Sequence, residues 1–318
     1  MRNLFIWIII MATCAYLGSK WYLHNEVSQG MDTAVLMMSP YANVEYEGVA
    51  STLTGELTIE GIRIRIDGFN DDLYIDSLGI DTPSFLSLIE LGDVAKMQSD
   101  GLPEHFGFIM EGLRVPADAD YYSKLYAFTL EARGITDADE AAAECTGKYG
   151  FSPAALAGLG YTEQVISSSI TFNNQRGKYS LDLTVSMDDM WDMDVSLTLA
   201  GDMLSEMSRG LASRPRLSSL EVEMTDRSLN KRVTEYCSQR GLSEKEIVQA
   251  KLDSFKFAGE ENGIEFDEYV LEPYVDYIGG KSTLVVTARP NEPVAMSQIH
   301  LYKPSDVPAL LNLEATAL

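Results

Sequence analysis

Two short stretches of the chain each place a cysteine ahead of a glycine and the start of a new helix. Residues 144–156 read ECTGKYGFSPAAL, and residues 236–248 read YCSQRGLSEKEIV. An even pair of cysteines in an exported domain is typical of a disulfide, so the sequence predicts a bond between Cys145 and Cys237. Two unpaired, buried thiols are the alternative. The remaining cysteine, Cys14, lies in an apolar N-terminal run, outside this pair.

The other side chains that could do chemistry form no recognisable site. The three histidines, His24, His105 and His300, lie far apart without a second ligand at helical spacing. The acidic run at residues 188–194 lacks the glycine and the closing glutamate of a calcium loop, and it predicts a solvated hairpin turn. The sequence contains no phosphate loop, nucleophile elbow or zinc spacing. We therefore expect a protein that is not an enzyme and that needs no metal or cofactor.

The N-terminus points to export. Arg2 precedes LFIWIIIMATCAYLG, an uncharged apolar run, and a basic start with a short apolar block fits a secretory signal peptide. A good small-x-small cleavage triplet is missing, however, and counting through Leu23 gives about 20 residues, enough to span a bilayer. We expect an uncleaved transmembrane anchor, with a cleaved signal as the alternative. Arg2 marks the cytoplasmic side, which places the rest of the chain outside the cytoplasm.

The net charge of the chain excludes two classes of partner. The chain of 318 residues has a formal net charge of −24, and 46% of its residues are hydrophobic. A folded chain this acidic is unsuited to binding nucleic acid, which requires basic patches. It is equally unsuited to docking on an anionic lipid surface through charge.

Strand-like alternation begins near residue 53 and changes phase at glycines. Apolar residues alternate up to Gly61, and the apolar set then shifts by one position; the same shift occurs at Gly112. A one-residue slip of this kind predicts a β-bulge or bend. The shift indicates either a sheet curled around a ligand or the ordinary bulges of a large twisted sheet. The curled-sheet reading predicts an apolar ligand face made by Leu57, Ile59, Ile62, Ile64, Phe106, Phe108 and Met110.

The order of elements suggests an internal repeat. Helices are expected over 84–97 and 118–133, after Ser152, and after the capping box that begins at Ser243. Strands are expected at about 164–173, 178–187, 193–200, 253–258, 282–289 and 297–302. The predicted fold is α+β: a curved, mostly antiparallel sheet (or sheets) with packed helices, in two pseudo-repeated strand–helix–helix–strand units after an N-terminal membrane helix. The expected parts are an anchor (1–23), a stalk (24–40), unit 1 (41–201) and unit 2 (202–318), packed as one body.

The stretch VEYEGVASTLTGELTIEGIRIRIDG, following an apolar N-terminus, resembles the start of AsmA-type envelope proteins of Gram-negative bacteria. The matching residues are Gly55, Leu57, Ile59, Ile62 and Ile64. The resemblance covers about 80 residues, and the helical units after residue 117 depart from it. It implies a curved sheet with an apolar inner face that handles lipid acyl chains in the periplasm. Location at the inner membrane, single-pass through residues 4–23 with the bulk of the chain periplasmic, agrees with it.

Two classes of function follow from these features. The first is a membrane-anchored periplasmic protein that binds lipid or another apolar ligand in envelope maintenance or transport. The second is a non-catalytic structural or assembly subunit of an envelope complex, with a protein partner. The sequence alone leaves both open.

Overall fold

The computed structural model describes residues 18–91, 104–132, 145, 150–175, 178–201 and 216–318, apart from residues 19, 23, 26, 34 and 53. Most of the expected anchor, and residues 92–97 of the helix expected over 84–97, lie outside the described residues. Within these ranges, none of the helices combines the length and the apolar content that crossing a bilayer requires.

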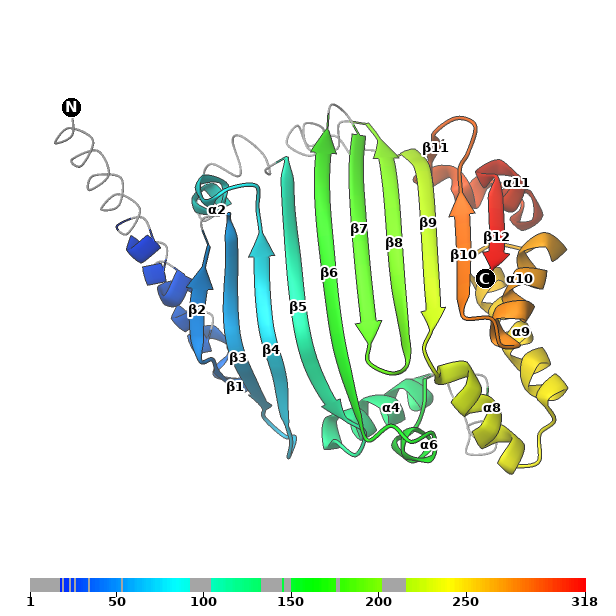
Figure 1. The fold of residues 1–318 in the computed structure, drawn as a ribbon, viewed down its shortest axis with the longest axis horizontal. Coiled ribbons are helices and arrows are strands. Elements are labelled where there is room, and N and C mark those ends of the chain that lie inside the picture. The colour runs from blue at the N-terminus through cyan, green and yellow to red at the C-terminus, as the bar shows by residue number, and fades with distance from the viewer. Residues whose placement is uncertain are drawn as a thin grey trace, which may run out of the picture.

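One antiparallel sheet organises the molecule (Figure 1). Its strands follow one another along the chain from β3 to β10, and β1 and β12 form the two ends of the path, while β2 pairs with β3 and β11 with β9. The strands are β1 (Ala42–Glu45), β2 (Gly48–Ser51), β3 (Glu56–Ile66), β4 (Asp72–Asp81), β5 (His105–Pro116), β6 (Glu163–Gln175), β7 (Lys178–Met187), β8 (Trp191–Ala200), β9 (Arg216–Asp226), β10 (Thr283–Ala288), β11 (Val294–Ala295) and β12 (Leu313–Ala317).

The predicted fold of two repeated units is wrong. The structure is a single 12-stranded sheet, and β8 and β9 pair from Trp191↔Asp226 to Ala200↔Arg216, across the expected boundary between the units. The similar order of elements around the two cysteines does not produce two similar bodies. Strand pairing joins neighbours in sequence, so a continuous meander forms wherever successive strands can pair.

Helices occupy the margins of this sheet (Figure 1). In the figure α2 lies at the upper end of β3, α4, α6 and α8 lie along the lower edge, and α9 to α11 lie beside β10 and β12. The described residues between 18 and 38 are also helical. The helices are α2 (Phe85–Leu91), α4 (Asp120–Ala132), α6 (Pro153–Gly158), α8 (Leu229–Gln239), α9 (Glu244–Glu261), α10 (Glu268–Ile278), α11 (Val307–Leu311) and the 3₁₀ helices η1 (Met296–Leu301) and η2 (Pro304–Asp306).

Two expected strands are helical instead. Residues 253–258 belong to α9, and residues 297–302 fall mainly in η1. The capping box of Ser243 and Glu246 starts α9, and apolar side chains continue at helical spacing through Ile247, Val248 and Leu252. Without a breaker the helix extends to Glu261, so the local alternation of Phe255 and Phe257 does not set a strand.

The two phase shifts occur where the glycines predict them. Gly61 and Gly112 both have positive φ, 62° and 65°, and the register of β5 against β6 shifts between Met110 and Leu113. A left-handed residue in a strand is the mark of a bulge that begins at glycine. The bulge turns Leu113 to the same face as Met110.

Replacing Gly112 with alanine should lower the free energy of unfolding by about 1–2 kcal/mol, because a left-handed conformation costs any L-residue with a Cβ about that much. A Cβ at this position would also overlap the side chain of Asp76. Chemical denaturation measures the change. Gly107→Ala, on the same strand but with ordinary contacts around its Cβ, is the control and should change stability by less than about 0.5 kcal/mol. Equal effects of the two substitutions would contradict the assignment of a bulge.

Candidate functional site

The sheet has one polar and one apolar face, because antiparallel partners share a face and neighbours in a strand alternate. Across the middle strands, one row of partners runs Ser169, Thr184, Asp194, Glu223, and the next row on the other face runs Ile170, Leu183, Val195, Val222. On the polar face Thr184 donates a hydrogen bond to Asp194 at 2.7 Å. The polar face is therefore the solvent face.

The apolar face is covered at its two ends and at one edge. The helix that ends near residue 38 contributes Val27 and Val35 to clusters over β3 and β4, together with α2. At the other end α9, α10 and α11 pack on β9, β10 and β12. The edge of the sheet at the turn between β7 and β8 is covered by α6 and α8, which pack with α9 around Met190 of that turn.

The middle of this face carries apolar side chains that belong to none of the buried clusters of the described chain. We call them the central apolar face. Phe108 is 50% exposed, and the others are half-buried, beneath no described helix. The central apolar face consists of Phe108, Ile170, Leu181, Leu183, Val185, Met193, Val195 and Val222.

A cavity of about 290 Å³ lies at the β3–β6 side of the central apolar face. Phe108 and Ile170 line it from the central face. Most of its remaining lining is apolar as well, and Ser168 is the polar exception: Leu57, Ile59, Leu78, Gly79, Ile80, Ile109, Met110 and Ser168.

The seven residues that the sequence assigns to an apolar ligand face divide between this cavity and the core. Leu57, Ile59, Phe108 and Met110 line the cavity. Ile62 is buried against Val44 and Ile75, with Ile64 packed on the same cluster. Phe106 is buried and stacks on Phe172 with ring centroids 4.9 Å apart.

The apolar ligand face predicted from the sequence ends at β5. Strands β6, β7 and β8 were expected near their observed positions, and Leu181, Leu183 and Val185 alternate within β7 as clearly as Leu57 and Ile59 do in β3. This alternation could have predicted an apolar face on β7. Only the strand register shows that the apolar residues of β7 lie on the same face as those of β5, because Phe108 pairs with Ile170 and Ile170 pairs with Leu183.

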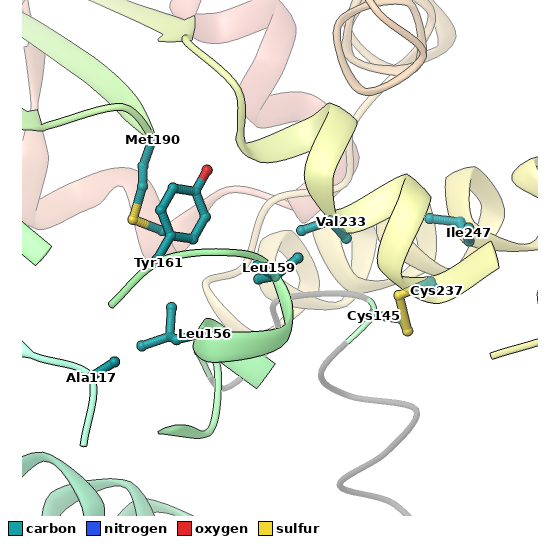
Figure 2. Packing of buried hydrophobic residues seen from close by; sticks show 9 residues of the cluster. All are labelled: Ala117, Cys145, Leu156, Leu159, Tyr161, Met190, Val233, Cys237 and Ile247. Carbon is teal, nitrogen blue, oxygen red and sulfur yellow. A yellow bond between two sulfur atoms is a disulfide. The ribbon is translucent and has the colours of Figure 1, made fainter. Parts of the chain in front are cut away.

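Cys145 and Cys237 form a disulfide in the structure, with Cα atoms 5.9 Å apart (Figure 2). Both are buried in the cluster at the lower margin of the sheet, and Cys237 lies on α8. Figure 2 shows the bond beside Val233 and Ile247; Leu156 of α6 and Leu159, which follows that helix, belong to the same cluster. The bond closes a loop of 92 residues that contains β6 to β9.

A second cavity, of about 300 Å³, lies between α8, α9, α10 and the β8–β9 pair. Lys251 of α9 lines it and is 7% exposed, which makes it the one buried basic residue among those described. Its Nζ donates a hydrogen bond to Asn230 Oδ1 at 2.9 Å. Asp226 also lines the cavity and accepts a hydrogen bond from the backbone N–H of Asn230 at 2.9 Å.

Burial lowers the pKa of Lys251 to about 8, because the low-polarity surroundings disfavour the ammonium and the carboxylate of Asp226 offsets this only in part. Burial likewise raises the pKa of Asp226 and raises that of Tyr274 to about 12. Lys251 is therefore the group in this cavity that changes charge between pH 7 and pH 9.5.

The stability of the protein should accordingly rise between pH 8 and pH 9.5. In this window the unfolded chain keeps a proton on Lys251, whose ordinary pKa is 10.5, and the folded protein releases it. The unfolded state then binds more protons, so stability increases with pH, by about 1–2 kcal/mol. Denaturant titrations at pH 7.0 and pH 9.5 measure it. Lys251→Met should remove the rise, whereas the exposed Lys256→Met on the same helix should keep it; a rise of the same size in Lys251→Met would contradict the assignment.

The other candidates for chemistry have structural partners. His105 contacts Asn173 through Nδ1 at 2.6 Å and Asp81 through Nε2 at 3.4 Å. Residues 188–190 form the turn between β7 and β8, and Asp192 accepts hydrogen bonds from Ser186 and Arg227. Across the described ranges, no three His, Cys, Asp or Glu side chains come together in a way that could hold a metal ion.

Part of the chain matches a known protein family. A family model described as "Uncharacterized protein" matches residues 178–318, which is less than half of the chain. The match begins at the first residue of β7 and includes Lys251. No curated protein matches the chain.

Proposed function

We propose that the protein binds the hydrocarbon chains of lipids against the central apolar face. The observation that supports this most directly is the row Phe108, Ile170, Leu183, Val195 and Val222, which lies on one face of the sheet beneath no described helix. Large contiguous apolar patches that stay open on a folded protein mark binding sites.

Hydrocarbon is the occupant that this surface suits best. The backbone N–H and C=O groups of β5 to β9 are engaged in strand pairing, and the side chains of the central apolar face carry no N–H or O–H donor. An extended peptide lying there would leave its own backbone groups without partners, at a cost of a few kcal/mol each. A lipid chain has no such groups to satisfy.

The length of the central apolar face matches the length of a lipid chain. Five strands at a spacing of about 4.8 Å make the row from Phe108 to Val222 roughly 19 Å long. One lipid chain fills about half of a hydrocarbon core that is about 30 Å thick. A single chain lying across the strands would therefore fit within the row.

We propose further that the protein works outside the cytoplasm, held at the inner membrane by residues 4–23. The disulfide supports an oxidising compartment, and Trp21 and Tyr22, which are 67% and 52% exposed, suit a membrane interface. A reporter enzyme that works only in the periplasm, fused after Leu318, should be active, and the fusion should remain in the membrane fraction. Activity of a cytoplasmic reporter at the same position, or a shortened periplasmic product, would contradict this.

Native mass spectrometry after gentle extraction tests the proposed function. The expected spectrum contains the protein with one or more phospholipids or fatty acids retained. A stoichiometric protein partner in place of lipid would instead support a structural or assembly subunit of an envelope complex. Ligand-free protein from lipid-rich extracts would count against lipid binding.

A further inference from the structure

The cavity that holds Lys251 contains a cation with unused hydrogen-bonding capacity. An ammonium has three N–H donors. One of them bonds Asn230, and among the described residues no other hydrogen bond or ion pair joins Lys251 to the chain. Buried donors without acceptors are costly, so a bound group that supplies acceptors here would be stabilised.

The carboxylate of Asp226 does not act as the acceptor for the remaining donors of Lys251. Its carboxylate accepts the backbone N–H of Asn230, at the first turn of α8, where the helix dipole favours negative charge. It acts on Lys251 through space, without an ion-pair contact between them. Among the described residues, two donors of the ammonium therefore have no acceptor and are available to a ligand.

The cavity opens on the same face of the sheet as the central apolar face. Met224 and Trp191 line it from the sheet. Met224 pairs with Met193 of the central apolar face, and Met193 pairs with Val185. A chain that lies along this row leads from open hydrocarbon-binding surface to the buried ammonium.

We propose that this cavity binds the acidic head group of a single-chain amphiphile, a long-chain carboxylic acid, with Lys251 as its counter-ion. This inference rests on the proposed binding of hydrocarbon chains to the central apolar face. A volume of about 300 Å³ is at the lower limit for ligand pockets and suits a compact head group. The two oxygens of a carboxylate match the two available donors of Lys251.

Calorimetric titration of the full-length protein with palmitate and with hexadecanol, in the same non-ionic detergent, tests the head-group site. The two ligands share a chain and differ in the head group. At pH 7 palmitate should bind roughly tenfold or more tightly than hexadecanol, as expected for a hydrogen-bonded ion pair in a buried site. Lys251→Met should abolish this preference, and the exposed Lys256→Met on the same helix should retain it.

The preference for palmitate should also fall at pH 9.5 in the unaltered protein. The titratable groups around the site are Lys251, Asp226, Tyr274 and Tyr277. Burial raises the pKa of both tyrosines, so they stay neutral, and Asp226 stays ionised, which leaves Lys251 as the group that loses its charge. This comparison needs no variant and decides the question even where Lys251→Met folds poorly.

Equal affinities for palmitate and hexadecanol at pH 7 would overturn the head-group site and leave the binding of hydrocarbon chains intact. Retention of the preference in folded Lys251→Met would overturn it as well. Binding of neither ligand would overturn the proposed function together with the inference.

Discussion

Phe108→Asp is expected to abolish binding of lipid chains and to leave the protein folded. Phe108 is 50% exposed at the β5 end of the central apolar face, so a carboxylate at this position stays in water in the free protein. A bound chain would cover that carboxylate and bury it without a partner, at a cost of several kcal/mol. The expected loss of affinity is at least about 100-fold. Binding of palmitate and thermal unfolding by circular dichroism measure the two effects.

Ser169→Asp is the matched control, because Ser169 lies next to Ile170 on β6 but faces the polar side, opposite Thr184. It should change neither binding nor folding. Ile64→Asp should destabilise the protein, since the half-buried Ile64 packs on the core cluster of Ile62 and Ile75, and a carboxylate against that cluster should lower the free energy of unfolding by about 1–3 kcal/mol. Unfolding of Phe108→Asp to the same extent as Ile64→Asp would contradict an open face.

Removing the disulfide is expected to lower the free energy of unfolding by roughly 2–5 kcal/mol. The bond between Cys145 and Cys237 closes a loop of 92 residues, and it restricts the unfolded chain more than a short loop would. Both cysteines are also buried in the cluster at the lower margin of the sheet.

The measurement compares denaturation of the Cys145→Ala/Cys237→Ala double variant with that of the parent protein. Cys14→Ala, which changes the cysteine outside the pair, is the control and should leave stability unchanged. Unchanged stability in the double variant would contradict the expected contribution. Two free thiols in protein purified from its native envelope would contradict both the bond and an oxidising compartment.

Local patterns in the sequence predicted local structure well. The strands at 164–173, 178–187 and 193–200 are confirmed as β6, β7 and β8, and the N-cap at Ser152 and the capping box at Ser243 are confirmed as helix starts. Period-two alternation and helix caps depend on contacts between residues close in sequence, which a single sequence records directly.

Apart from the bond between Cys145 and Cys237, the long-range arrangement of the chain could not be predicted. The similar sequence segments around Cys145 and Cys237 predicted two repeated units, but the pairing of β8 with β9 joins all the strands in one sheet. The extent of the apolar face depends on the register of β5 to β9, and register is a relation between strands that alternation alone leaves undetermined. The cavity around Lys251 likewise exists only because three helices and two strands meet there, which no spacing in the sequence indicates.

Site-specific photocrosslinking from β7 is the most direct measure of what the central apolar face contacts. A photoreactive amino acid replaces either Leu183, on the apolar face, or its neighbour Thr184, which is exposed on the polar face. Illumination of living cells should attach a lipid chain to the protein at position 183 and none at position 184, as read by mass spectrometry of the modified peptide. Equal lipid attachment at both positions, or attachment of a protein alone at position 183, would contradict lipid binding on this face.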